Sequence, residues 1–226
     1  KKMSLNERIE SFLHSMIKDE EGIIGIIEQE ALTDQVPIIR KETKDWLKTM
    51  LLIKKPERIL EVGTAVGFSS IFMCQHISKT SHITTIEKWE PRIEQAKINF
   101  ARAKVEDKVT LLEGDAAEIL HELAVNGNQT FDFIFMDAAK GQYIHFLPDV
   151  IRLLEKDGVL VSDNVLQDGE ILDSRYVVER RNRTIHSRMR EYLYELKNNN
   201  SLDTSVIPLG DGVALSVKLD KKEEMI

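Results

Sequence analysis

The sequence contains one cysteine, no apolar run of eighteen or more residues, and no linker rich in proline, glycine or serine. A single cysteine, Cys74, excludes an internal disulfide and a cysteine-rich zinc site, so we expect a reducing compartment and a small buried residue on a helix. The missing apolar run argues against a membrane-spanning helix, and the N-terminus lacks the residue order of a signal peptide. These absences predict a cytoplasmic protein that has no membrane partner.

The length and composition predict a single domain. With 226 residues, of which 42% are hydrophobic, the chain can bury one substantial core but is short for two. The sequence has no internal repeat and no low-complexity segment. We therefore expect one domain over residues 3–226, made of a helical N-terminal extension over 3–55 and a core over 56–219.

The core alternates short apolar runs with longer amphipathic stretches, which is typical of strand–helix units that build a parallel sheet. The predicted fold is α/β and Rossmann-like, a mostly parallel seven-stranded sheet with a C-terminal antiparallel hairpin and extra N-terminal helices. The hairpin is expected because two strand-like runs flank the turn Gly210-Asp211-Gly212. The predicted strands are 58–62, 82–86, 108–112, 131–136, 158–162, 204–209 and 212–218, and the predicted core helices lie near 67–78, 90–104, 115–125 and 141–155.

Residues after the first three predicted strands suit a nucleoside ligand. Ligands of open parallel sheets bind outside the carboxyl ends of the strands. Gly63 and Gly67 let the chain turn tightly there, before a helix begins. Glu87 can accept hydrogen bonds from both ribose hydroxyls. Asp115 can accept one from an adenine amino group, and the small Ala116 leaves room for the ring.

Two other interpretations of these residues are open. A nicotinamide dehydrogenase would need three glycines in the pattern G-x-G-x-x-G, whereas this chain has only Gly63 and Gly67 and so lacks a pyrophosphate cradle. Alternatively, each residue could be an ordinary turn glycine or a solvated acid. The agreement of three strand ends favours the nucleoside.

Oxygen donors follow the fourth and fifth predicted strands. Asp137 ends the fourth strand, and Asp163 and Asn164 end the fifth. Two carboxylates and an amide oxygen at one edge of a sheet suit a hard cation such as Mg²⁺, although an Asp-Asn pair can also simply cap a turn. Lys140 comes shortly after Asp137, where a nearby cation and partial burial would lower its pKa and make it a general base, although most lysines are exposed surface residues.

Five stretches together resemble the metal-dependent O-methyltransferases that include the catechol and caffeoyl-coenzyme A methyltransferases. They are ILEVGTAVGFSS, TTIEK, GDA, FIFMDAAKGQY and VLVSDN, and the similarity extends from about residue 36 to 217. The resemblance implies S-adenosylmethionine as cofactor, Mg²⁺ or Mn²⁺ as metal, and a homodimer with the N-terminal helices as candidate contacts.

The resemblance also implies roles for individual residues. Asp137, Asp163 and Asn164 would bind the metal, and the catalytic residues would be Lys140, as the base, and Asp137. Ile39 is a looser match, because its segment has no fixed motif. The implied cofactor contacts are Ile39, Glu61, Gly63, Ser69, Glu87, Asp115, Ala116 and Asp137.

The stretches VPI, MDAAKGQY, DNVL and PLGDGVALS are most similar to a bacterial branch that methylates 5-hydroxyuridine at the wobble position of transfer RNA, which gives 5-methoxyuridine. That base presents a vicinal oxygen pair, as a catechol does, so one metal site suits both acceptors. The alternatives are a catechol-like or coenzyme A-linked small molecule and, more distantly, a non-catalytic RNA-binding module.

A local arginine cluster bears on this choice. The formal net charge is −7, yet residues 175–190 contain six arginines and a single acid, Glu179. We expect these arginines to bind phosphates of an anticodon loop, although a solvated helix face would look the same. The candidate RNA-binding arginines are Arg175, Arg180, Arg181, Arg183 and Arg188, with Arg190 in the same cluster. Tyr176, His186 and Tyr192 are candidates for stacking on bases, although each could equally fill the core or the surface.

Overall fold

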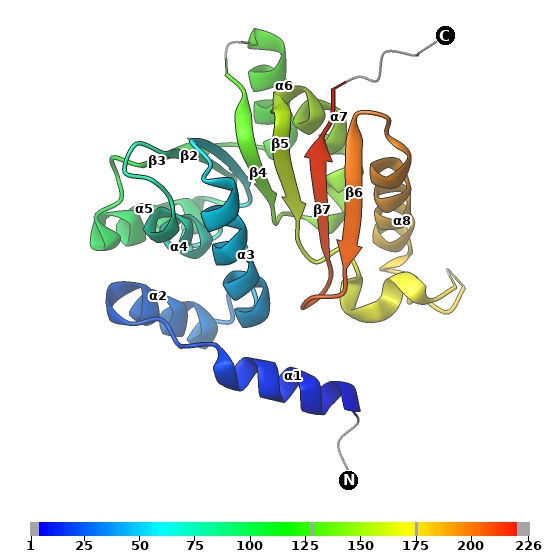
Figure 1. Ribbon diagram of the computed structural model, residues 1–226, viewed down its shortest axis with the longest axis horizontal. Coiled ribbons are helices and arrows are strands. Elements are labelled where there is room, and N and C mark those ends of the chain that lie inside the picture. Colours follow the sequence, from blue (N-terminus) through cyan, green and yellow to red (C-terminus); the bar gives the residue numbers. More distant parts are fainter. Residues whose placement is uncertain (1–4, 128, 175, 221–226) are drawn as a thin grey trace.

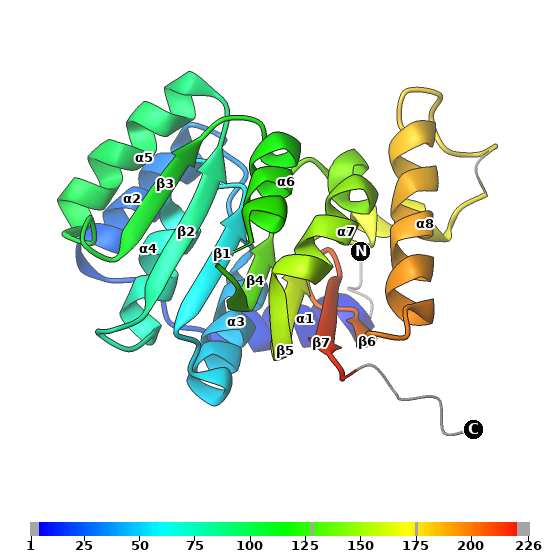
Figure 2. The same cartoon turned by 90° about the horizontal axis from the view of Figure 1, so that it is seen from above.

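The computed structural model describes residues 5–127, 129–174 and 176–220 and shows one seven-stranded sheet in the order β3-β2-β1-β4-β5-β7-β6 (Figures 1 and 2). The first five strands are parallel, and β7 is antiparallel to both β5 and β6. This confirms the predicted Rossmann-like fold and its C-terminal hairpin. The strands are β1 (Arg58–Val62), β2 (His82–Glu87), β3 (Val109–Glu113), β4 (Phe131–Met136), β5 (Leu154–Ser162), β6 (Leu202–Ile207) and β7 (Val213–Lys218).

Helices cover both faces of the sheet, and each face has its own apolar core (Figure 2). One core joins the sheet to α2 (Gly22–Thr33), α3 (Lys41–Lys54), α4 (Phe68–His76) and α5 (Glu90–Ala103). The other joins it to α6 (Ala116–Asn126), α7 (Tyr143–Leu153) and α8 (Arg183–Asn198). Because both faces are covered, the central strands β1 and β4 are almost entirely buried, as parallel sheets require.

The N-terminal extension is helical, as predicted, and its α2 and α3 pack against α4. The buried Lys44 of α3 joins them, because its ammonium lies 2.6 Å from Glu28 and 5.4 Å from the centre of the Phe68 ring on α4. The remaining helix of the extension, α1 (Leu5–Met16), lies at the periphery of the molecule (Figure 1). The short segment between α2 and α3 carries Ile39 to the carboxyl edge of the sheet.

Several boundaries differ from the sequence prediction: β6 spans Leu202–Ile207 where residues 204–209 were expected, and the largest differences lie around residues 140–158. The helix predicted over 141–155 is a 3-10 turn at Lys140–Gln142 followed by α7, which ends at Leu153. Strand β5 begins at once with Leu154, which pairs with Phe131. The prediction placed this strand later because residues 155–157 are charged; they lie on an exposed part of the sheet where charge is tolerated.

Helix α8 was expected only as a helix of the arginine cluster, without bounds, although its apolar spacing is regular. It buries His186, Met189, Tyr192 and Leu196 at intervals of three and four residues, which is one face of a helix. Cys74 is 6% exposed on α4, as expected, and burial raises its pKa to about 12. Among the residues that the structure describes, no helix has the length and apolarity needed to span a membrane.

Candidate active site

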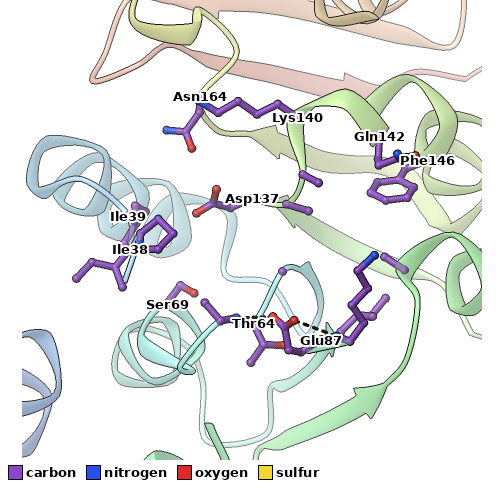
Figure 3. A pocket seen from close by; sticks show the side chains of 18 of the residues that line it. Ile38, Ile39, Thr64, Ser69, Glu87, Asp137, Lys140, Gln142, Phe146 and Asn164 are labelled. Carbon is purple, nitrogen blue, oxygen red and sulfur yellow. Dashed lines mark hydrogen bonds between the residues drawn. The ribbon is translucent and has the colours of Figure 1, made fainter. Parts of the chain in front are cut away.

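A cavity of about 620 Å³ opens at the carboxyl edge of the sheet (Figure 3). Its volume is in the range of small-molecule and cofactor sites. The structure gathers almost all the residues that the sequence singled out for this edge. Those that line the cavity are Ile39, Gly63, Ser69, Glu87, Asp115, Ala116, Asp137, Lys140 and Asn164.

The loop after β1, which forms part of the cavity wall, requires glycine at position 63. Gly63 has φ +106°, and a Cβ placed on it would lie 2.1 Å from the carbonyl oxygen of Asp137. Only a residue without a side chain allows the loop after β1 to pass so close to the loop after β4. The turn then enters α4 through Gly67, which has φ +81°.

The Glu87 carboxylate is held in one orientation at the end of β2. One oxygen accepts a hydrogen bond from the backbone N–H of Ala65 at 2.9 Å. The other accepts from the N–H groups of Lys88 and Trp89 at 2.9 and 3.0 Å. The first oxygen accepts only one of these hydrogen bonds and so retains acceptor capacity toward the cavity, where a ribose hydroxyl could donate to it.

Asp115 follows β3 and forms the N-cap of α6. Its side chain accepts from the backbone N–H of Ala117 at 2.9 Å and lies 3.3 Å from the Lys88 ammonium. The Ala117 hydrogen bond and, after it, Lys88 hold the pKa of Asp115 below its ordinary value. Asp115 is therefore a preorganised acceptor at the cavity wall, next to Ala116.

Glu61 occupies a different place from the one that the sequence suggested. It is fully buried and is absent from the cavity wall, and its carboxylate accepts hydrogen bonds from the hydroxyls of Ser69, Ser70 and Thr85. Burial raises its pKa. Glu61 thus lies behind the wall and orients Ser69, which does line the cavity.

The predicted metal ligands come from two strands that are in register. Met136 of β4 pairs with Ser162 of β5, so Asp137 and Asp163 leave the sheet side by side. The backbone N–H of Asp163 donates to the Met136 carbonyl at 3.0 Å. Figure 3 shows the Asp137 carboxylate and the Asn164 amide directed into the same space.

The electrostatics of this pair suit a bound cation. Burial raises the pKa of Asp137 to about 6, with Glu61 as the second cause. Burial also raises the pKa of Asp163 to about 7, and the charge of Asp137 adds to it. The Oδ2 atom of Asp163 is buried and has no hydrogen-bond partner among the described residues. A buried carboxylate with an unsatisfied oxygen, next to the half-buried Asp137, is costly unless a cation compensates the charge.

The donor set is small. In the described part of the chain, no three His, Cys, Asp or Glu side chains gather as a metal site. The predicted set has only two carboxylates and is completed by the Asn164 amide oxygen, so its donors are all oxygen. Such a set fits Mg²⁺ or Mn²⁺, which keep several positions for water and substrate.

The hydroxyl of Tyr143 connects the ends of β4 and β5, a role that the sequence did not indicate. The side chain is fully buried, and its hydroxyl lies 3.1 Å from the carbonyl oxygens of both Met136 and Asp163. It also accepts a hydrogen bond from the N–H of Ala138 at 3.2 Å. One hydroxyl therefore contacts the backbone on both sides of Asp137 and at Asp163 itself.

Lys140 lies at the cavity wall, but its ammonium has a partner that the sequence analysis missed. The Nζ atom is 3.0 Å from Oδ2 of Asp211, whose side chain is 2% exposed. Asp211 belongs to the turn between β6 and β7. The glycines on either side of it marked the turn, but nothing local in the sequence indicated that the turn meets Lys140.

The arginine cluster is less free than predicted. Arg175 lies outside the described residues, and Arg180 and Arg181 are exposed ahead of α8, with Arg181 2.7 Å from Glu179. The others bind backbone carbonyls: Arg183 those of Tyr176 and Val178, Arg188 that of Gly141, and Arg190 that of Ile171. A guanidinium has five N–H donors, so these arginines can still bind anions while they hold the loops.

The three aromatic residues that were candidates for stacking on bases differ in their exposure to solvent. A stacking role for His186 and Tyr192 is wrong, because both are buried and Tyr192 forms a hydrogen bond of 2.6 Å with Ser162. Both residues lie on the face of α8 that packs against the core, because buried residues recur along this helix every three or four positions. Tyr176 is 87% exposed and is free to stack.

Comparisons with known proteins point to one family. The profile of the O-methyltransferase family matches residues 23–219. A catechol O-methyltransferase of Niastella koreensis is 29% identical, with 76% of this chain and 78% of that protein covered. A caffeoyl-CoA O-methyltransferase of Populus kitakamiensis is 30% identical, with 77% and 75% covered. A Staphylococcus aureus structure provisionally described as a caffeoyl-CoA O-methyltransferase has 32% identity and a TM-score of 0.83, with 95% and 100% covered.

Proposed function

Because this chain belongs to the O-methyltransferase family, we propose that its cavity binds S-adenosylmethionine and that it methylates a hydroxyl oxygen held beside Asp137, Asp163 and Asn164. One observation carries the proposal. The nucleoside-binding groups after β1 to β3 and two of the oxygen donors, Asp137 and Asn164, line the same cavity, and the third donor, Asp163, is buried beside them. A methyl donor and a metal-held acceptor bound there would face each other.

Different residues of the cavity bind different parts of the cofactor. Glu87 receives the ribose hydroxyls, and Asp115 receives the adenine amino group beside Ala116. Gly63 allows close approach of the backbone, and Ser69, held by Glu61, offers a hydroxyl to the amino-acid end. Ile39 supplies an apolar contact from the N-terminal extension.

Asp137, Asp163 and Asn164 would hold Mg²⁺ or Mn²⁺. When bound, the cation supplies a positive charge that favours the deprotonated form of the acceptor hydroxyl. Lys140, in its neutral amine form, takes the hydroxyl proton on Nζ, and the oxygen electron pair then forms the O–CH₃ bond as the C–S bond breaks. The sulfonium loses its charge, and Lys140 leaves the reaction as an ammonium.

The acceptor that we propose is 5-hydroxyuridine at the wobble position of a transfer RNA. The exposed Arg180, Arg181 and Tyr176 offer phosphate-binding and stacking groups in one segment. Arg188 of the same region donates to the Gly141 carbonyl, next to Lys140, so this segment adjoins the acceptor side of the cavity. The target base must leave the loop stack, which is easiest in a single-stranded anticodon loop.

The second candidate is the same reaction on a catechol-like or coenzyme A-linked hydroxyl. The named activities of the relatives favour it. A small phenol has no need of the exposed arginines, so RNA binding separates the two candidates.

A direct experiment compares acceptors side by side. The purified protein is incubated with Mg²⁺, methyl-labelled S-adenosylmethionine and, separately, an anticodon stem-loop carrying 5-hydroxyuridine, catechol, and caffeoyl-coenzyme A. Preferential label in the RNA supports the transfer RNA acceptor, and preferential label in a phenol contradicts it. RNA binding without methyl transfer to any acceptor would contradict the proposed activity and support the distant alternative, a non-catalytic RNA-binding module.

A cellular measurement complements this assay. We expect transfer RNA nucleosides from a strain lacking this protein to accumulate 5-hydroxyuridine at the expense of 5-methoxyuridine, as read by mass spectrometry. Unchanged 5-methoxyuridine would contradict the proposal.

We also propose a homodimer that uses the N-terminal helices. Helix α1 exposes four large apolar side chains that a second copy could cover: Ile9, Phe12, Leu13 and Met16. Light scattering should give twice the mass of the chain. Replacing Phe12 and Leu13 with Ser should shift the protein toward the monomer, and a monomeric parent protein would contradict the proposal.

A further inference from the structure

We propose that Asp211 is a positioning residue that holds the Nζ atom of Lys140 at the cavity wall and joins the three loops that surround the acceptor. The inference rests on the proposed function, since it concerns the group that takes the acceptor proton. It adds a residue that neither the motifs nor the family assignment singled out.

Asp211 reaches this place because of the hairpin. Strand β7 is antiparallel to β5, so the turn between β6 and β7 lies beside the end of β5. The N–H of Leu166 donates to the Asp211 carbonyl at 2.8 Å, and the N–H of Val165 donates to the Gly212 carbonyl at 3.0 Å. A Cβ on Gly212 would lie 2.2 Å from Cγ of Leu166, so the two loops are in direct contact.

Each carboxylate oxygen of Asp211 has its own partner. Oδ2 lies 3.0 Å from Lys140 Nζ, in the loop after β4. Oδ1 accepts from the backbone N–H of Asp168, in the loop after β5. One buried side chain of the hairpin therefore links the base to the loop that carries Asp163 and Asn164.

The burial of the two partners is unequal. The Lys140 side chain is 32% exposed, and the Asp211 side chain is 2% exposed. A lysine has a flexible four-carbon stem, and a fixed acceptor reduces the number of positions its amine can occupy. Asp211 is thus the fixed partner, and Lys140 is the one that it orients.

The pairing of Asp211 with Lys140 also affects the transfer of the acceptor proton. When Lys140 takes the acceptor proton, its amine becomes an ammonium, and the carboxylate of Asp211 is already in place to stabilise that charge. Asp211 itself gains no proton in this step. Its contribution is to the position and charge balance of Lys140.

The test is Asp211→Asn, which keeps an oxygen for the Asp168 N–H but places a neutral amide at Lys140. Labelling with acetic anhydride, read by peptide mass spectrometry, should modify Lys140 about threefold to tenfold faster than in the parent protein, relative to Lys79, because the buried carboxylate no longer holds the Nζ atom in place. With the acceptor methylated in the comparison above, kcat should fall about tenfold or more while the acceptor KM changes by less than about twofold. Binding of S-adenosylhomocysteine and Mn²⁺ should be unchanged.

Asp168→Asn is the matched control. It removes a carboxylate of the same loop that pairs with Arg40, and it leaves the backbone N–H and Lys140 untouched, so labelling and kcat should stay at parent values. Unchanged Lys140 labelling in Asp211→Asn would overturn the inference, as would a loss of S-adenosylhomocysteine and Mn²⁺ binding that parallels the fall in kcat. If the parent protein methylates no acceptor, the proposed function fails, and the labelling result still decides whether Asp211 holds Lys140.

Discussion

Gly63 and Asp137 approach each other so closely that a Cβ on the glycine would lie 2.1 Å from the aspartate carbonyl oxygen. The two residues end neighbouring strands, and the N–H of Asp137 donates to Val62 at 3.0 Å, so neither loop can move away without breaking the edge of the sheet. The contact joins the cofactor side of the cavity to the proposed metal side.

Gly63→Ala should therefore damage the cavity as well as the fold. We expect loss of S-adenosylhomocysteine binding in calorimetry and a clear fall in melting temperature. Gly169→Ala is a matched control, because Gly169 also has positive φ but no atom within 4 Å of its Cβ position. The control should cost only about 1 kcal/mol of backbone strain and leave binding intact. Equal effects of the two substitutions would show that the close approach does not matter.

The stability of the metal-free protein should fall as pH rises from about 4 to about 7. Asp137 and Asp163 have folded pKa values raised to about 6 and about 7. The folded state then binds more protons than the unfolded state in this window, and the free energy of unfolding decreases with pH. Thermal unfolding from pH 4 to 8 should show this slope, and Asp163→Asn should flatten it. An identical slope in that variant would refute the assignment.

Mg²⁺ or Mn²⁺ should restore this stability at neutral pH. Ionised Asp137 and Asp163 are the form that binds a cation, so added metal should raise the melting temperature at pH 7.5 and have little effect at pH 5. Asp163→Ala should remove this response, and both that substitution and EDTA should abolish turnover. Full activity in chelator would remove the metal from the proposal.

Tyr143→Phe should weaken metal binding while the fold persists. The substitution keeps the buried ring and deletes the hydroxyl that contacts Met136, Ala138 and Asp163. We expect Mn²⁺ affinity to fall about tenfold or more, as for other residues that orient metal ligands. Tyr192→Phe serves as the control, because its hydroxyl meets only Ser162 in the part of the chain that is described. Comparable loss of affinity in the control would point to general loosening of this core.

Replacing Arg180 and Arg181 together with Ala should weaken binding of the anticodon stem-loop and reduce the salt dependence. Each lost phosphate contact lowers the slope of log affinity against log salt by roughly 0.7 for a single strand. Affinity for S-adenosylhomocysteine should not change. Lys79→Ala with Lys104→Ala removes the same charge at the opposite edge of the sheet and should have little effect. Unchanged RNA binding in the arginine variant would count against RNA as the acceptor.

Much of the fold was predictable because its signals are local. Strand-length apolar runs such as residues 58–62 and 131–136 lie where expected, and the residues after them meet at one edge because parallel strands share a direction. Charge misled the prediction at the start of β5, where Leu154 pairs with Phe131 before an exposed charged stretch. The carbonyl partners of Arg183, Arg188 and Arg190 were not predictable either, since a charged side chain looks solvated until the fold brings its partner close.

By itself the sequence determined the order of strands and helices along the chain and the polar residues that follow the parallel strands, among them Asp137, Asp163 and Asn164. Only the tertiary structure decided that Glu61 lies behind the wall, that Tyr143 joins two strand ends, and that Asp211 meets Lys140 across 71 residues of chain. Local sequence patterns specify the period and ends of elements. Contacts between distant loops depend on which strands become neighbours and how closely their backbones approach, and those are properties of the assembled sheet.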